Sequence, residues 1–158
     1  MVRTMLTQLT KLAQECEGRY ANDAELEFLK DYLEEIDSRI DAYSTIRDNE
    51  KEITEQIDVQ LKSENPDVFH KCGKDFSSIC ERDRKHTMRF LATAMLFNEQ
   101  DKLRGTLLWQ SIIMRAFQDE NPSNFTYKMM GQVMSKQLKD EEMKLVKPAL
   151  QLVQTMLG

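Results

Sequence analysis

The spacing of apolar residues is the feature that most limits what this chain can fold into. Between residues 26 and 43, apolar side chains recur at alternating steps of three and four, at Leu26, Leu29, Leu33, Ile36, Ile40 and Tyr43. This spacing places them on one face of an α-helix. Similar spacing continues through most of the chain, and no stretch shows the strict alternation of apolar and polar residues that is typical of a half-buried strand. The sequence therefore predicts an all-α fold.

Capping residues and helix breakers divide this pattern into separate helices. A short first helix is expected to end near Gly18, and Asn22 with Glu25 has the spacing of a capping box at the start of the second helix. Another helix start lies at Asp48-Asn49, and Asn65-Pro66 closes the helix that begins there. The first half of the chain is therefore expected to hold three helices.

The second half begins with a loop and a long central helix. Residues 66–75 are expected to form the loop, and the central helix runs from near Cys80 to about Phe97. Asp101 can begin the helix that follows.

Two prolines mark the last part of the chain. The segment Asn121-Pro122-Ser123 predicts a turn and a new helix start, since proline is tolerated at the first helical position. Residues 140–157 have helical spacing, but Pro148 is expected to kink or divide that helix. In total the sequence predicts about seven or eight helices.

Length, charge and hydropathy narrow the class of protein. A chain of 158 residues is expected to form one domain over residues 1–158. The net charge of −5 disfavours nucleic acid or an anionic membrane surface as a partner. Since no apolar run approaches the length that spans a bilayer, we expect a cytoplasmic protein without membrane insertion.

Cysteine, histidine and methionine usage adds further limits. Three cysteines without a Cys-x-x-Cys pair disfavour a disulfide framework and a zinc site, and two histidines are few for a metal site. No metal site is therefore expected. The ten methionines are explained by adaptable core packing, with the wall of a ligand cavity as the alternative.

One short stretch combines a thiol, a cation and a carboxylate. Cys80 and Asp83 lie about one helical turn apart on the same face, and Thr87 follows one turn later. Arg82 points sideways but has a side chain long enough to reach over a ligand held at the cysteine. These groups suit a ligand that carries both N–H groups and carboxylates.

A linear tetrapyrrole fits that description, and Cys-x-Arg-Asp at the start of a long helix resembles the chromophore site of phycobiliproteins. The resemblance extends along the chain to Gly18-Arg19-Tyr20, to Arg89 on the central helix and to the segment 121–125. It implies a globin-like bundle with an N-terminal helical hairpin, in which residues 1–20 form a helical extension. The chain is thus similar to the allophycocyanin and phycocyanin subunits.

The resemblance also implies a function and a cofactor. It makes Cys80 the candidate for a thioether to a bilin of the phycocyanobilin type, Asp83 the acceptor for the pyrrole N–H groups, and Arg82 the partner of a propionate. Thr87 and Phe125 are further candidate contacts, and Tyr127 is a second candidate aromatic contact beside Phe125. The implied role is light harvesting rather than enzymatic catalysis.

The sequence departs from the family pattern at two places. Arg84-Lys85-His86-Thr87 stands where the family has aromatic residues, and Asn98-Glu99-Gln100-Asp101 stands where it has a glycine-containing turn. These differences indicate a divergent member, for which covalent and non-covalent bilin binding both stay open.

Three other functions are alternatives to bilin binding. An unpigmented interaction or regulatory module of the phycobilisome is the main alternative. A haem-binding globin needs an axial ligand, for which only His70 and His86 are candidates. An enzyme is the least favoured, because Cys80 has no histidine on its helical face.

Partners and location follow from the same resemblance. A hairpin is too small to bury the leucines of residues 1–45 by itself, and such apolar surface usually marks a contact. We expect a homodimer or a complex with a phycobiliprotein-like partner subunit through these residues. The expected location is the cytoplasm, with association to the cytoplasmic face of thylakoid membranes through the phycobilisome.

Overall fold

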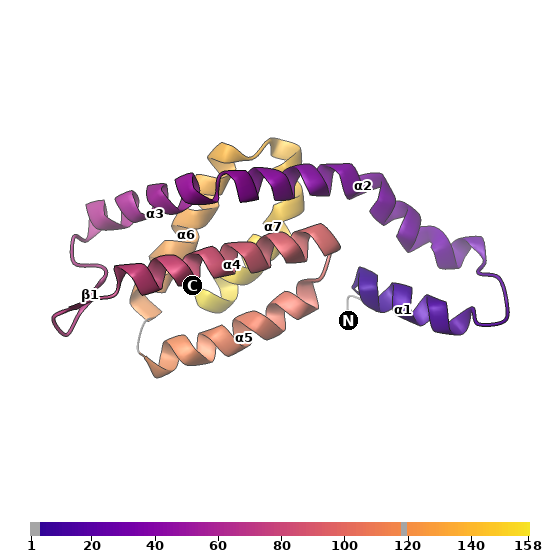
Figure 1. The fold of residues 1–158 in the computed structure, drawn as a ribbon, viewed down its shortest axis with the longest axis horizontal. Helices are drawn as coiled ribbons and strands as arrows, with labels where there is room; N and C mark the ends of the chain where they lie inside the picture. Colours follow the sequence, from indigo (N-terminus) through magenta and orange to yellow (C-terminus); the bar gives the residue numbers. More distant parts are fainter. Residues whose placement is uncertain (1–3, 118–119) are drawn as a thin grey trace.

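Seven helices make up most of the computed structural model, which describes residues 4–117 and 120–158, with side chains from residue 125 onward in the second range (Figure 1). The helices are α1 (Met5–Glu15), α2 (Asp23–Asp48), α3 (Glu50–Glu64), α4 (Ser77–Phe97), α5 (Gln100–Ala116), α6 (Glu120–Gln137) and α7 (Asp140–Leu157). Two short strands, β1 (His70–Lys71) and β2 (Lys74–Asp75), lie between α3 and α4. The predicted all-α, globin-like fold is confirmed.

The helices separate into a bundle and a projecting hairpin. Helix α1 and the first half of α2 extend to one side, while the remaining helices pack around α4, with α5 on one side and α6 and α7 on another (Figure 1). The strands lie at the opposite end of the molecule from the hairpin (Figure 1). Within the described part of the chain, no helix is both long and apolar enough to cross a membrane.

The capping box predicted at the start of α2 is confirmed. The side chain of Asn22 accepts from the backbone N–H of Glu25, and the carboxylate of Glu25 accepts from the N–H of Asn22, each at 2.9 Å. A hydrogen bond from Arg19 contributes most to lowering the pKa of Glu25 to about 2. The charge of Glu25 is therefore kept at the helix N-terminus, where it is favourable.

Residues 66–75, predicted as a loop, contain a tight antiparallel hairpin instead. His70 pairs with Asp75 and Lys71 with Lys74. The turn between them uses Cys72 and Gly73, with φ of 52° and 74°. Positive φ at both central residues matches a type I′ turn, which suits two-residue hairpins. Strands of two residues are too short to leave a period in the sequence.

Pro148 is expected from the sequence to kink or divide the last helix; it does not divide it, because α7 is continuous from Asp140 to Leu157 with Pro148 inside it. Proline removes one backbone donor, so the carbonyl of Lys144 loses its helical partner. Both residues are exposed, and water can satisfy that carbonyl. The predicted turn at Asn121-Pro122-Ser123 belongs to the backbone of α6, and its side chains lie outside the described residues.

The core is formed where α4 packs against α2, α5 and α7, and where α6 packs against α3 and α7. Fully buried side chains come from four of these helices, α3, α4, α6 and α7: Ile53, Ile57, Met88, Leu91, Met95, Met130, Val133, Met134, Val146 and Val153. Four of them are methionines, which supports core packing as the reason for the high methionine content.

A charged pair interrupts this apolar core between α3 and α4. Arg84 is 3% exposed, donates to the carboxylate of Asp58, and stacks over the ring of Phe69 at 5.2 Å. Its Nε atom is buried without a hydrogen-bond partner. Burial raises the pKa of Asp58, while the charge of Arg84 opposes the rise. This arginine therefore depends on Asp58 for the compensation of its charge.

We predict that Asp58→Ala lowers the free energy of unfolding by about 3 kcal/mol, because it leaves the Arg84 guanidinium buried without a counter-charge. Asp58→Ala combined with Arg84→Met, in contrast, should change it by less than about 1 kcal/mol, because replacing both partners leaves no buried charge without a counter-charge. Urea denaturation of the two variants and the wild type measures both values. Equal losses in the two variants would contradict the prediction.

Candidate functional site

Helix α4 positions the predicted site residues along its first turns. It begins at Ser77, directly after the β-hairpin, and the N–H of Cys80 donates to the carbonyl of Phe76 at 2.9 Å. Cys80 is half-buried and packs against the core. The side chains of Arg82 and Asp83, on the same turn of the helix, reach further into solvent. The thiol therefore lies at the boundary between core and surface.

Arg82 and Asp83 pair with each other. The Nε and Nη2 atoms of Arg82 donate to Oδ1 of Asp83 at 3.0 and 2.9 Å. Their side chains are 61% and 47% exposed. An exposed pair of this kind is worth only about 0.2–1 kcal/mol, so a ligand that offers each group a better partner can separate them.

Thr87 belongs to the interior rather than to the exposed surface. It is 0% exposed, and its hydroxyl donates to the backbone carbonyl of Asp83 at 3.0 Å. The same oxygen accepts from Nε2 of Gln110 at 3.0 Å and lies 3.3 Å from the hydroxyl of Tyr127. One hydrogen-bonded cluster thus joins α4, α5 and α6 beneath the Asp83 position.

Tyr127 completes this cluster and stays neutral. Only 3% of the residue is exposed, and burial raises the pKa of its hydroxyl, with the negative charge of Asp83 adding to the rise. Sequence reasoning identified Tyr127 as a possible aromatic contact but missed Gln110. Gln110 is one of eight polar residues in the helix 100–116, so the sequence holds no signal that distinguishes it.

Phe125 lies one half-turn before Tyr127 on α6 and is 54% exposed. Its ring is therefore presented at the surface, whereas Tyr127 is directed into the interior. Among the predicted site residues, Asp83 contacts Arg82 through its carboxylate and Thr87 through its backbone carbonyl.

A shallow pocket of about 300 Å³ lies on the surface of α4 beside Arg82, at the low end of the size of small-molecule sites. Its walls are polar and come from one helix: Ser78, Glu81, Arg82, Lys85, His86 and Arg89. The cations are already paired, Lys85 with Glu81 at 2.6 Å and Arg89 with Glu50 at 2.6 Å. Since the charges are balanced, the pocket does not present a free positive field to an anion.

The comparison with known protein families supplies the identity of the fold. The family model of phycobilisome proteins matches residues 12–157, which include every predicted site residue. The chain belongs to the phycobilisome protein family. This match covers nearly the whole chain and includes the segment Cys80-Glu81-Arg82-Asp83, which resembles a phycobiliprotein chromophore site.

Individual relatives are similar over shorter stretches. Allophycocyanin alpha-B chains are 33% identical over 89 residues in Cyanidium caldarium, 31% over 101 residues in Cyanophora paradoxa, and 29% over 104 residues in Pyropia yezoensis. These stretches cover 54%, 61% and 63% of this chain, and 55%, 62% and 64% of the respective relative. The chain therefore matches less than two thirds of the length of each relative and is a divergent member of its family.

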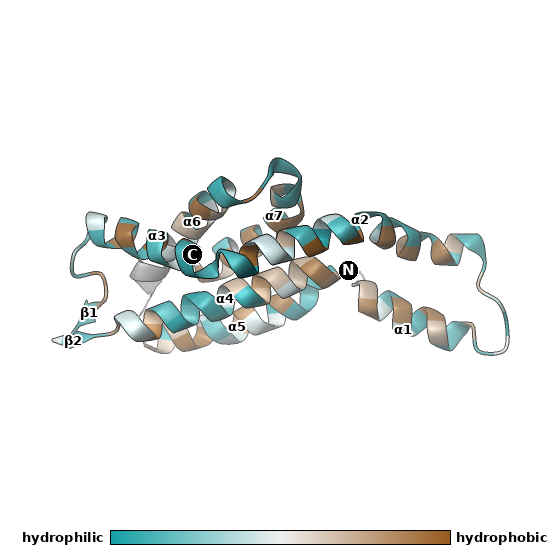
Figure 2. Cartoon of the chain, turned by 45° about the horizontal axis from the view of Figure 1, so that its top comes forward, coloured by the Kyte–Doolittle hydropathy of each residue, from teal (hydrophilic) through white to brown (hydrophobic). Residues whose placement is uncertain are grey.

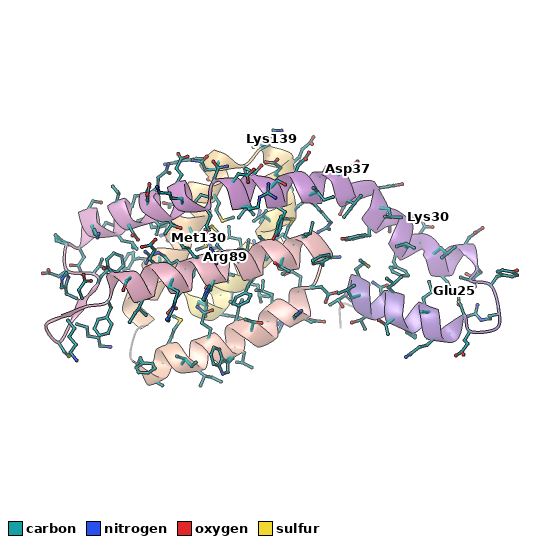
Figure 3. All side chains as sticks on the ribbon, in the orientation of Figure 1. Glu25, Lys30, Asp37, Arg89, Met130 and Lys139 are labelled. Atoms are coloured by element: carbon teal, nitrogen blue, oxygen red, sulfur yellow. The ribbon has the colours of Figure 1, made fainter. Side chains whose placement is uncertain are left out.

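Arg89, which is labelled on α4 in Figure 3, is the last family-like residue of that helix. It forms a two-pronged pair with Glu50 of α3. The distances from Nε and Nη2 to the two carboxylate oxygens are 2.6 and 2.8 Å. The hydrogen bond from Arg89 lowers the pKa of Glu50 below its ordinary value of 4.5. A carboxyl group whose pKa is lowered by folding stabilises the fold above its unfolded pKa and loses that effect as the pH falls.

We predict that Glu50→Gln lowers the free energy of unfolding by about 0.5 kcal/mol near neutral pH, since Arg89 is mostly exposed. The difference from the wild type should disappear as the pH falls below 4.5, the ordinary pKa of glutamate. Denaturant titrations at several pH values measure it. Glu55→Gln is the control, because its carboxylate lies 3.8 Å from Lys51 and is exposed. A Glu50 difference that persists into strong acid would contradict the prediction.

Proposed function

We propose that this protein is a bilin-binding member of the phycobilisome, with the tetrapyrrole held along the first turns of α4. The observation that carries the proposal is the cluster of Cys80, Arg82 and Asp83 at the accessible start of that helix, in a chain that the phycobilisome family model matches. The three groups differ in chemistry, and each suits one part of an open-chain tetrapyrrole.

Cys80 is the candidate attachment point. Its S–H adds across a carbon–carbon double bond on ring A, so that a C–S bond forms and the proton goes to the neighbouring carbon. This addition needs no oxidant or reductant. Because Cys80 also packs against the core, a bilin joined there is fixed at one end to a rigid helix.

Asp83 and Arg82 are the candidate polar contacts. When a bilin enters, the Asp83 carboxylate accepts from the pyrrole N–H groups, and the guanidinium of Arg82 turns to a propionate. Charge-assisted bonds of this kind are stronger than neutral ones and replace the exposed pair that joins the two residues in the free protein. Beneath them, Thr87 and Tyr127 keep the helix fixed rather than reaching the pigment themselves.

Rigidity is the physical reason why such a site serves light harvesting. A bilin held by several contacts loses less of its excitation through rotation about its methine bridges. The role of the protein is therefore to bind and orient the pigment. Through the phycobilisome, we place the protein at the cytoplasmic face of thylakoid membranes.

An unpigmented interaction or regulatory module is the second candidate. The observation that favours it is that the polar groups of the candidate site already have partners within the protein. Arg82 pairs with Asp83, and Thr87 is buried in the hydrogen-bonded cluster. The aromatic residues expected after Asp83 are replaced by Arg84 and three other residues. On this proposal the protein assembles with the antenna without absorbing light.

Both proposals include a partner subunit, bound through the projecting hairpin. None of the residues of α1, all of which the structure describes, is buried, and in α2 the buried residues begin only at Arg39. Large apolar side chains are exposed there at Leu6 (46%), Leu9 (38%), Leu33 (56%) and Ile40 (47%). Figure 2 shows hydrophobic segments along α1 and the projecting half of α2. Such a surface fits a homodimer or a phycobiliprotein-like partner.

The pigment proposal predicts how two cysteine variants differ in the pigment that they retain in a bilin-producing host. Cys80→Ala should abolish the pigment that survives acid–urea denaturation while leaving part of the reversible binding, because the contacts of Asp83 and Arg82 need no sulfur. Cys72→Ala is the matched control, since Cys72 is exposed at the tip of the β-hairpin, and it should leave the pigment unchanged. Absorption spectra before and after denaturation measure both.

Two outcomes would oppose this proposal in different ways. Pigment retained after denaturation in Cys80→Ala would place the attachment elsewhere. A colourless wild-type protein from the same host, with a spectrum that added bilin does not change, would make the unpigmented module the better description.

The partner proposal predicts that Leu33→Glu combined with Ile40→Glu weakens association at least tenfold, because each change puts a charge into an apolar contact. Val59→Glu is the control: Val59 is 69% exposed on α3, away from the hairpin, and its replacement should leave association unchanged. Sedimentation across micromolar concentrations, with the protein alone and with purified allophycocyanin, measures the dissociation constants. A wild type that stays monomeric in both experiments would reject the interface.

A further inference from the structure

The C-terminal end of α4 collects hydrogen bonds from both helices of the hairpin. The hydroxyl of Tyr32 donates to the carbonyl of Leu96 at 2.8 Å, and the guanidinium of Arg39 donates to the carbonyl of Met95. Both donors come from α2. The backbone N–H of Leu6, in α1, donates to Oε1 of Glu99 at 3.0 Å. Three groups from α1 and α2 therefore converge on residues 95–99.

The two α2 donors meet carbonyls in the last turn of α4, where the Met95 carbonyl otherwise accepts only a long hydrogen bond of 3.4 Å from the N–H of Asn98. The last four carbonyls of an α-helix have no partner within it, and a cation is favoured at that end. Asn98 ends α4 in the left-handed conformation, with φ of 53°, and turns the chain directly into α5. The turn places Glu99 beside the start of α1.

Glu99 is used in an unusual way. It stands at the N-cap of α5, yet its side chain makes no capping hydrogen bond there. The carboxylate instead reaches the first turn of α1, which contains no acidic residue of its own. Glu99 is only 9% exposed, and the neighbouring cap residue Thr4 is 5% exposed. A nearly buried carboxylate thus satisfies one of the free N–H groups at the start of α1 and complements the positive end of that helix.

We propose that Glu99 is a positioning residue for the subunit interface, which fixes the direction in which α1 leaves the bundle. This inference rests on the proposed partner function. Because α1 buries none of its own residues, packing alone does little to fix it. The hydrogen bond from Leu6 holds Leu6 and Leu9 in place before a partner arrives, and a surface ordered in advance loses less conformational entropy on binding.

Two substitutions and one control test the proposal. Glu99→Ala removes the acceptor, whereas Glu99→Gln keeps an acceptor oxygen and removes the charge. Asp101→Asn is the control, because Asp101 is an exposed acid in the first turn of α5 and lies two residues away. Hydrogen exchange of the Leu6 amide in dilute protein reports the contact directly. Sedimentation with the protein itself and with purified allophycocyanin reports association.

We expect Glu99→Ala to speed exchange of the Leu6 amide by about tenfold or more, the usual effect of losing a hydrogen bond to a charged group. Glu99→Gln should speed it by about threefold, and Asp101→Asn should leave it unchanged. The dissociation constants should rise in the same order. Unchanged exchange at the α4 core amides of Met88 and Leu91 shows that each variant is folded.

The outcomes separate this inference from the proposed function. Unchanged exchange at Leu6 in both Glu99 variants overturns the positioning role, and so does faster exchange without any loss of association. A wild type that associates with neither partner rejects the interface and with it the positioning role. Faster exchange together with weaker association, graded from Gln to Ala, supports the proposal.

Discussion

The burial of one face of α4 between α2 and α7 is the constraint on which the rest of the structure depends. Met88, Leu91 and Met95 are all 0% exposed on that face. Each such side chain contributes about 1.5–3 kcal/mol through its removal from water, so together they fix the rotation of the helix about its axis. Once that rotation is fixed, Arg82 and Asp83 must face the surface. The position of the candidate site is thus a consequence of core packing on the other side of the same helix.

Local signals allowed most of the fold to be predicted from the sequence. The capping box of Asn22 and Glu25 and the end of α4 at Phe97 each depend on residues close in the chain. The β-hairpin at residues 70–75 escaped prediction because two-residue strands are shorter than any period. Pro148 does not divide α7, because the cost of a proline inside a helix depends on its exposure. On the outer face of α7 water replaces the missing hydrogen bond, and only the tertiary structure shows which face is outer.

The candidate site was predictable in its residue types but not in its partners. Cys80, Arg82 and Asp83 follow from spacing on one helix, whereas Gln110 joins Thr87 across 23 positions of the sequence. The same holds for buried Arg84 and Asp58, 26 positions apart, and for Leu6 and Glu99, 93 apart. Periodicity describes one helix at a time, so it cannot show that the packing of α5 and α6 buries the hydroxyl of Thr87.

Helix α4 therefore serves two purposes at its two ends. Its last residues anchor the hairpin through backbone carbonyls and the adjacent Glu99, and its first turns carry Cys80, Arg82 and Asp83. Hydrogen bonds within the chain account for the residues at the C-terminal end of α4. The other end is different, because Arg82 and Asp83 are exposed and contribute little to stability as a pair. On the proposed function, a bilin accounts for a guanidinium and a carboxylate beside a half-buried thiol through its N–H groups and its propionates.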